Sequence, residues 1–155
     1  MLEWVRMLVK DVMAKKLHTV GRGDGFRNIL KILVGNKISG VPVVNPDNKL
    51  VGIISEKDLL TKLFPSAKKF YKDINYYMNF DVIEREAAKI NKLKAMNLMT
   101  KKVITIGPEE HVLKACSLLL IHKIRRLPVV NKAGKLVGIV TTNNLYKNFL
   151  KKYAS

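Results

Sequence analysis

The sequence has a single cysteine and no long apolar run. Cys116 lacks a partner for an internal disulfide, which fits a reducing compartment such as the cytoplasm. No run of 18 apolar residues occurs, so we expect no membrane-spanning segment and no membrane partner. Residues 1–13 combine charged side chains with apolar positions at helical spacing, which indicates a helix packed on the body of the protein and not a signal peptide.

The sequence also lacks the common signatures of catalysis and metal binding. It contains no P-loop, no nucleophile elbow, no HExxH motif and no Cys/His spacing of a metal site. The histidines His18, His111 and His122 are scattered along the chain. We therefore expect no enzyme, no metal and no required cofactor.

Acidic residues are scarce, at 12 against 29 basic ones, and the net charge is +17. A charge of this size can serve a polyanion such as nucleic acid, whose binding would weaken steeply with salt. However, most of the basic residues are lysine, as an A/T-rich genome would encode, and lysine suits bidentate phosphate recognition less well than arginine. The compositional explanation is favoured, and a basic nucleic-acid-binding protein is the alternative.

The chain does contain a long internal repeat. The phrase VPVVNPDNKLVGII at 41–54 returns as LPVVNKAGKLVGIV at 127–140, an offset of 86 residues. The same offset aligns 9–60 with 95–146 without a gap. A match of this length does not arise by chance, so the chain is an internal duplication.

Each copy predicts the order β-α-β-β-α. A short extended segment precedes a helix with apolar residues at helical spacing, and the run Pro-Val-Val then indicates a buried strand. Asn48 and Gly134 hold equivalent places before the next strand, and both residue types tolerate positive φ, so a hairpin is expected. Ser55 and Thr141 end that strand, where each can cap the next helix. The expected leading strands are 17–20 and 103–106.

The predicted fold class is α+β or α/β, with mixed sheets covered by helices. One β-α-β-β-α unit has only a thin core, so two units are expected to pack by pseudo-twofold symmetry. The expected domains are a first repeat with an N-terminal helix (1–63), a helical insert (64–94) and a second repeat with a C-terminal helix (95–155).

The insert combines aromatic residues with lysines. It begins at Phe64-Pro65, where a helix should stop, and Asp81 with Glu84 could cap a later helix. Packing over the repeats or at a dimer contact is the favoured role. Basic and aromatic side chains can also hold single-stranded nucleic acid, which is the alternative.

The doubled pattern resembles the CBS-domain family. The pattern is Met-x5-Thr, a helix, Pro-Val-Val-Asn, Lys-Leu-Val-Gly-Ile and Ser/Thr-x-x-Asp/Asn-Leu, and it occurs twice. A tandem pair of this kind is called a Bateman module. The resemblance implies a regulatory or sensor module whose clefts bind AMP, ADP, ATP or S-adenosylmethionine. It also implies an unidentified regulated protein and a homodimer, for which we expect the apolar helix positions Ile29, Leu33, Leu118, Leu119 and Ile121 to supply the contact.

The family's ribose-and-phosphate signature is Gly-h-h-Ser/Thr-x-x-Asp, which reads Gly52–Asp58 and Gly138–Asn144 here. The resemblance implies that the hydroxyl and the helix N-terminus hold phosphate, and that Asp58 accepts from ribose hydroxyls. Ser55 with Asp58 equally resembles a capping box that serves only the helix. Asn144 departs from the signature because it has no carboxylate.

Carried over residue by residue, the resemblance implies two clefts that each draw on both repeats. Cleft A is expected to contain Ser55, Asp58, Lys102, Val103, Ile104, Arg125 and Arg126. Cleft B is expected to contain Lys16, Leu17, His18, Ser39, Gly40, Thr141 and Asn144. Cleft A has the carboxylate and more basic residues, so it is expected to bind the first adenosine ligand more tightly.

Overall fold

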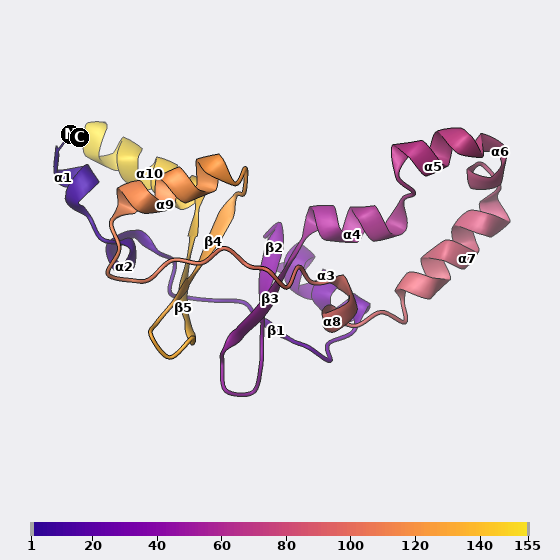
Figure 1. Ribbon diagram of the computed structural model, residues 1–155, viewed down its shortest axis with the longest axis horizontal. Helices are drawn as coiled ribbons and strands as arrows, with labels where there is room; N and C mark the ends of the chain where they lie inside the picture. Colours follow the sequence, from indigo (N-terminus) through magenta and orange to yellow (C-terminus); the bar gives the residue numbers. More distant parts are fainter. Residues whose placement is uncertain (1, 155) are drawn as a thin grey trace. The chain divides into compact units, whose positions relative to one another are not determined.

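A computed structural model describes residues 2–154, which form two compact units (Figure 1). Unit 1 holds the chain up to Leu17, the segment Pro46–Leu50 and the chain from Lys102 onward, whereas unit 2 holds His18–Asn45 and Val51–Lys101. Each unit therefore combines the body of one repeat with the leading segment of the other. The compact units and the sequence repeats are two different divisions of the chain.

Unit 2 contains a three-stranded sheet with the order β1-β2-β3. The strands are β1 (Val20–Gly21), β2 (Gly40–Val44) and β3 (Leu50–Ser55), with α3 (Phe26–Gly35) between β1 and β2 and α4 (Glu56–Leu63) after β3. β1 is parallel to β2, with Val20 opposite Val43. This is the predicted β-α-β-β-α order, with a first strand shorter than expected.

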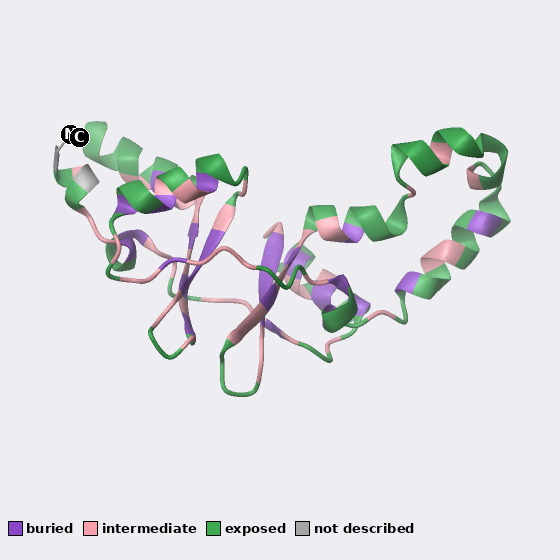
Figure 2. Ribbon diagram, viewed as in Figure 1, coloured by how far each residue is buried: buried purple, intermediate pink, exposed green. Residues whose placement is uncertain are grey.

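The core of unit 2 lies between α3 and the sheet. Phe26, Ile29 and Leu33 recur at helical spacing on α3, and all three are buried (Figure 2). They pack in one cluster with Val41 and Val43 of β2. The Pro-Val-Val run is thus a buried strand, as its composition predicts.

The insert forms helices within unit 2. They are α5 (Ala67–Lys72), α6 (Ile74–Tyr77) and α7 (Phe80–Ile90), and α8 (Ala95–Leu98) opens the second repeat. α4 ends at Leu63, just before Phe64-Pro65, as predicted. The prediction that Asp81 caps α7 was wrong: the Asn79 side chain accepts from the Asp81 N–H at 2.9 Å, so Asp81 lies in the first turn.

Unit 1 contains the antiparallel pair β4 (Arg126–Val130) and β5 (Leu136–Thr141). Its helices are α1 (Leu2–Arg6), α2 (Val9–Val12), α9 (Val112–Ile121) and α10 (Thr142–Tyr153). Val112, Ala115 and Leu119 of α9 are buried, and Cys116 packs against the same core, where burial raises the pKa of its thiol. The leading strand expected at 103–106 is reduced to one parallel bridge, Ile106 to Val129.

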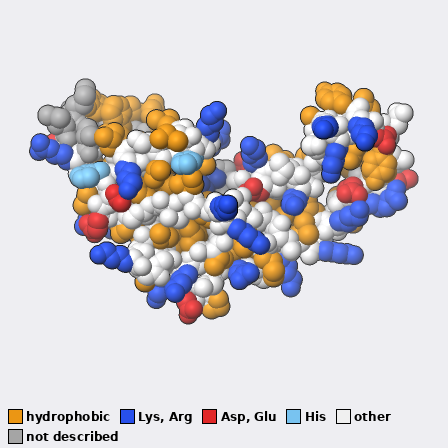
Figure 3. All heavy atoms as spheres, viewed as in Figure 1, with side chains coloured by type: hydrophobic (Ala, Val, Ile, Leu, Met, Phe, Trp, Pro, Cys, Tyr) orange, Lys and Arg blue, Asp and Glu red, His pale blue; other side chains and the backbone are white. Residues whose placement is uncertain are grey.

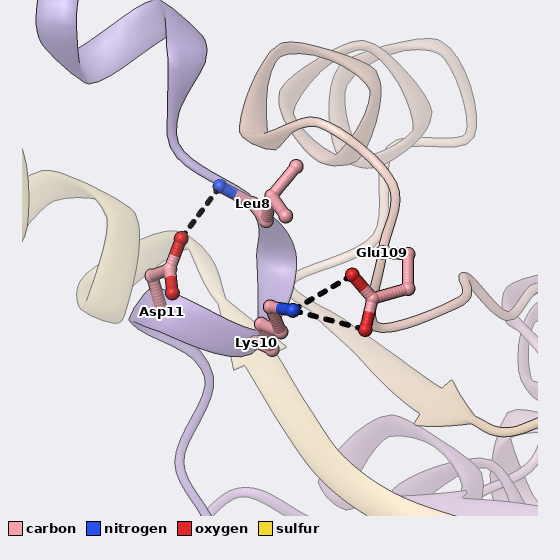
Figure 4. A network of polar contacts seen from close by, with 4 residues as sticks. All are labelled: Leu8, Lys10, Asp11 and Glu109. Carbon is pink, nitrogen blue, oxygen red and sulfur yellow. Dashed lines mark hydrogen bonds and ion pairs between the residues drawn. The ribbon is translucent and has the colours of Figure 1, made fainter.

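The N-terminal segment is two short helices instead of the single helix expected. The break falls at Met7 and Leu8, because these residues pair with the segment before α9: the Met7 carbonyl accepts from the Val112 N–H at 2.9 Å. Asp11 caps α2 by accepting from the Leu8 N–H at 2.9 Å. The Lys10 ammonium donates to both oxygens of Glu109, at 2.8 and 3.0 Å, and this bond raises the pKa of Lys10 (Figure 4).

Turn geometry repeats between the two copies. Asn48 and Gly134 have φ values of 60° and 78°, which confirms the prediction for the hairpin loops. Lys37 and Lys123, at equivalent places after α3 and α9, also have positive φ, at 52° and 51°. Lysine does not favour positive φ, so its residue type gives no signal for this turn. The one signal in the sequence is that lysine recurs at the same place in both copies.

The apolar faces proposed for a dimer are mostly core. Ile29, Leu33 and Leu119 are buried inside their own units, so the expectation that they meet a second copy was wrong. Helical periodicity identifies the face that the sheet covers, and it does not identify an outer face. The exposed apolar positions on these helices are Val34, Leu113, Leu120 and Ile121.

A methionine of each leading segment packs against a strand glycine. A Cβ added to Gly52 would lie 2.5 Å from Sδ and 2.8 Å from Cγ of Met99. In unit 1 a Cβ on Gly138 would meet Met13 in the same way. The motif glycines are therefore required by close approach, since neither has a positive φ.

We expect Gly52→Ala to lower the free energy of unfolding by about 1–3 kcal/mol, because the new methyl group overlaps Met99. Urea unfolding measures the change. Gly35→Ala is the control, since nothing lies within 4 Å of its added Cβ. Combining Gly52→Ala with Met99→Ala should cost less than the two separate losses together. A Gly52→Ala protein as stable as the wild type would contradict this packing.

Candidate functional site

The end of β3 and the start of α4 form a complete capping box. Ser55 Oγ accepts from the Asp58 N–H at 3.2 Å. Asp58 Oδ2 accepts from the Ser55 N–H at 2.8 Å and from the Ser55 hydroxyl at 2.9 Å. The alternative of a capping role for Ser55 and Asp58 is thus confirmed.

The capping box leaves one Asp58 oxygen available. Oδ2 already accepts two hydrogen bonds, whereas Oδ1 has a single long contact among the described residues, 3.5 Å from the Thr100 hydroxyl. Asp58 is half-buried as a residue. One carboxylate can therefore stabilise the helix and accept from a ligand hydroxyl at once.

The first turn of α4 offers fewer free N–H groups than expected. The Glu56 N–H donates to the Ser39 carbonyl at 2.9 Å, and the Asp58 N–H is taken by Ser55. The first three N–H groups of α4 belong to Glu56, Lys57 and Asp58. Among the described residues, the Lys57 N–H is the one of these three that has no backbone carbonyl or side-chain oxygen as a partner. A phosphate at this helix end would meet the Lys57 N–H and the positive end of the helix dipole.

The leading segment of the second repeat completes this side of unit 2. Thr100 and Ile53 exchange two backbone hydrogen bonds, of 2.8 and 3.1 Å. This pairing fixes Thr100 beside Asp58. Sequence reasoning missed Thr100, and the signal that could have found it is the recurrent Met-x5-Thr motif, in which Thr100 directly follows Met99.

Unit 1 repeats the capping box with a different chemical result. Asn144 Oδ1 accepts from the Thr141 N–H at 3.1 Å and from the Thr141 hydroxyl at 2.8 Å. The Asn144 N–H donates to Thr141 Oγ at 3.0 Å. Because the amide oxygen is used by the cap, the group left over is the NH₂, a donor. Asp58 keeps an acceptor at the equivalent place.

The surroundings of the second capping box also follow the repeat. Ala14 and Ile139 exchange backbone hydrogen bonds of 2.9 and 3.1 Å, as Thr100 and Ile53 do in unit 2. The Arg125 carbonyl accepts from the Thr142 N–H at 3.0 Å, and Arg126 lies opposite Thr141 in the sheet. Ala14 has no hydroxyl, so nothing equivalent to Thr100 reaches Asn144.

The structure assigns the predicted site residues to both units. Unit 2 contains Ser55, Asp58, His18, Ser39 and Gly40, and unit 1 contains Lys102, Val103, Ile104, Arg125, Arg126, Lys16, Leu17, Thr141 and Asn144. Within the units, Ser39 lies beside the Ser55 cap and Arg125 beside the Thr141 cap. Lys16 and Lys102 are exposed, and Leu17, His18, Val103 and Ile104 are half-buried outside the strands. The residues expected for each cleft are divided between the two units, so the composition of each cleft stays a prediction.

Comparison with known proteins agrees with the doubled architecture. The model of the CBS domain matches residues 9–65 and again 95–151. The uncharacterized protein MJ1426 of Methanocaldococcus jannaschii is 36% identical over 90% of this chain and 89% of its own. Other relatives are longer, and this chain spans 64% of one plant relative and 23% of a protein named as a homoserine O-acetyltransferase.

Solved structures with the same fold include two that contain adenosine compounds. CBSX2 in complex with AMP has a TM-score of 0.74 and 30% identity, covering 94% of this chain and 98% of its own; CBSX2 is a CBS-pair protein of Arabidopsis thaliana. The CBS domain pair of protein MJ0100, in complex with 5'-methylthioadenosine and S-adenosyl-L-methionine, has a TM-score of 0.68 and 27% identity, covering 94% of this chain and 98% of its own. Since both halves of the sequence match the family model and the folds correspond over nearly the whole chain, the protein belongs to the CBS-domain family, of which it carries two copies in tandem.

Proposed function

We propose that this protein is a CBS-pair sensor whose principal ligand site is the capping box of Ser55 and Asp58. The observation that carries the proposal is Asp58 Oδ1, which has only the long contact with the Thr100 hydroxyl among the described residues while the two hydrogen bonds to Oδ2 hold the carboxylate in place. The ligand class is adenosine-containing. The AMP complex of CBSX2 and the S-adenosyl-L-methionine complex of MJ0100 support this class.

The chemistry of the site suits a ribose. Its hydroxyls can donate to Oδ1, and hydrogen bonds to a charged group contribute roughly 1.5–3 kcal/mol, against about 1 kcal/mol for neutral pairs. The Lys57 N–H is available for a phosphate. The other residues of cleft A, above all Lys102 and the arginines Arg125 and Arg126, belong to the proposal as phosphate and adenine contacts. Cleft B, with Asn144, is the weaker site.

The proposed role is sensing and not catalysis. Homologues named as enzymes match this chain over only a small part of their own length, so their names do not support an activity here. None of the described helices is both long and apolar enough to cross a membrane. We propose that the protein acts in the cytoplasm through a regulated partner, to which it reports the occupancy of the site.

The decisive variants exchange the residues at the two caps. Asp58→Asn should weaken AMP binding about tenfold, because it removes the charged acceptor, and every 1.4 kcal/mol is about tenfold in affinity. The helix should remain capped, since Asn144 shows that asparagine makes the same contacts. Asn144→Asp should strengthen binding at the second site. Titration calorimetry measures both changes.

Thermal unfolding is the control for that pair of variants. The Asp58→Asn protein should unfold within a few degrees of the wild type, so a loss of affinity would report the carboxylate and not the fold. Asp58→Ala, which also removes the cap, should lose most of the measurable binding, whereas Asn144→Ala should change it little. Unchanged AMP affinity in Asp58→Asn would contradict the assignment of the principal site.

We also propose that the protein forms a homodimer through exposed apolar positions on α3 and α9. Leu120 and Ile121 are both exposed at the end of α9, at 77% and 72%. Changing both to lysine should shift the sedimentation mass of the wild type from two chains to one. Lys114→Gln, on the same helix, should leave the mass unchanged. A wild-type mass of one chain at every concentration would exclude the dimer.

A further inference from the structure

The turn from α5 to α7 exposes many large apolar side chains in few residues. We define the tip by Tyr71, Ile74, Tyr76, Met78 and Phe80, all of which are exposed, with Phe80 at 82% and Tyr71 at 73%. Figure 3 shows apolar and basic side chains together over the α5–α6 end of the insert. Scattered apolar residues are normal on a soluble protein, whereas a concentration of this kind marks an interaction surface.

The tip is an ordered structure and not a loose loop. Phe70 makes ring contacts with Tyr71 and Tyr77, with centroids 5.6 and 6.3 Å apart, and Tyr76 contacts Tyr77 at 5.1 Å. These contacts join α5 to α6. Two of the exposed rings, those of Tyr71 and Tyr76, are therefore held in place before any partner arrives.

The backbone of the tip meets its own hydrogen-bonding needs at the helix starts. Asp73 accepts from the Tyr76 N–H at 3.1 Å, and Asn79 accepts from the Asp81 N–H at 2.9 Å. An unpaired N–H is costly to remove from water. Because these donors are already paired, the tip can enter a less polar medium at a lower cost than an ordinary turn.

Lysines without an acidic partner lie on the helix where the tip begins. Lys68, Lys69 and Lys72 lie on α5, and none of them forms an ion pair within the described chain. Asp73 is the single acidic residue between Ser66 and Phe80. The tip therefore combines an apolar end with a basic flank.

We propose that the tip binds the surface of an anionic membrane. Tyrosine and phenylalanine side chains favour the boundary between headgroups and acyl chains, and lysines beside them attract anionic lipid phosphates. Surface binding of this kind needs no membrane-spanning helix. The expectation of no membrane partner rested on the lack of a long apolar run, which concerns spanning alone.

Two other partners could cover the tip: a second copy of the chain and single-stranded nucleic acid. The observations favour a lipid surface over both. A tip-to-tip dimer would bring the lysines Lys68, Lys69 and Lys72 of both copies into one contact, where the segment 66–80 offers a single acidic residue per copy, Asp73, to balance them. Single-stranded nucleic acid would use the rings, but Ile74 and Met78 are aliphatic and offer no ring on which a base can stack. A lipid surface uses the aliphatic, aromatic and basic side chains together.

The test is co-sedimentation of the full chain with vesicles rich in phosphatidylglycerol and with vesicles of pure phosphatidylcholine. The wild type should bind the first kind and bind the second at least tenfold more weakly. Tyr71→Ser with Phe80→Ser should reduce binding to the anionic vesicles at least tenfold. Lys68, Lys69 and Lys72 changed together to glutamine should also weaken it several-fold.

Matched variants outside the tip distinguish binding through the tip from a general attraction of the basic protein to anionic lipid. Tyr146→Ser with Leu150→Ser removes exposed apolar groups of α10, and Lys132, Lys135 and Lys147 changed to glutamine remove the same charge. Both should bind the anionic vesicles within about twofold of the wild type. Equal losses from the two lysine triples, or an unaffected Tyr71→Ser/Phe80→Ser protein, would overturn the proposal.

The competing occupants are tested with the same tip variant. Titration with a single-stranded oligonucleotide at physiological salt should show weak binding that Tyr71→Ser/Phe80→Ser leaves unchanged. Sedimentation should show the same mass for the variant and the wild type. A tip variant that loses oligonucleotide binding or dimer mass while keeping vesicle binding would assign the tip to nucleic acid or to a second copy. None of these outcomes depends on the adenosine site.

Discussion

The exchange of leading segments between the repeats is the constraint on which the rest of the structure depends. Met99-Thr100 pairs with β3 in unit 2, and Met13-Ala14 pairs with β5 in unit 1. Each pairing requires a glycine, Gly52 or Gly138, because the methionine side chain occupies the place of a Cβ. Each body therefore takes its pairing segment from the other repeat.

The same exchange prepares the site. Each segment pairs just before a strand ends in Ser55 or Thr141, where the chain turns into a helix, and the capping box then orients the residue three positions later. Two nearly identical frameworks thus present different groups: a carboxylate oxygen at Asp58 and an amide NH₂ at Asn144. The two copies share this framework, and they differ in the residue that it orients, Asp58 or Asn144, and in the neighbouring position, Thr100 or Ala14.

The sequence predicted the parts of this structure that have a local cause. Turn chemistry identified Asn48 and Gly134, and the N-cap preference identified Ser55 and Thr141. The offset of the repeat revealed the α-β-β-α order that both copies share, whereas the leading strand is short in the first copy and a single bridge in the second. The sequence did not separate Ile29 and Leu33, which are buried against the sheet, from Val34, which is exposed, because all three belong to one run of apolar residues. Thr100 was missed for a similar reason, since its contact with Asp58 crosses 42 residues of sequence.

The central claim is that the Ser55–Asp58 cap receives the adenosine ligand and has one first-turn N–H, that of Lys57, free to meet its phosphate. Amide hydrogen exchange with and without saturating AMP, resolved by residue, tests it most directly. The account predicts that AMP slows exchange at Lys57 far more than at Asn143, the equivalent position of the second cap. Equal protection at the two positions, or protection at Asn143 alone, would contradict it.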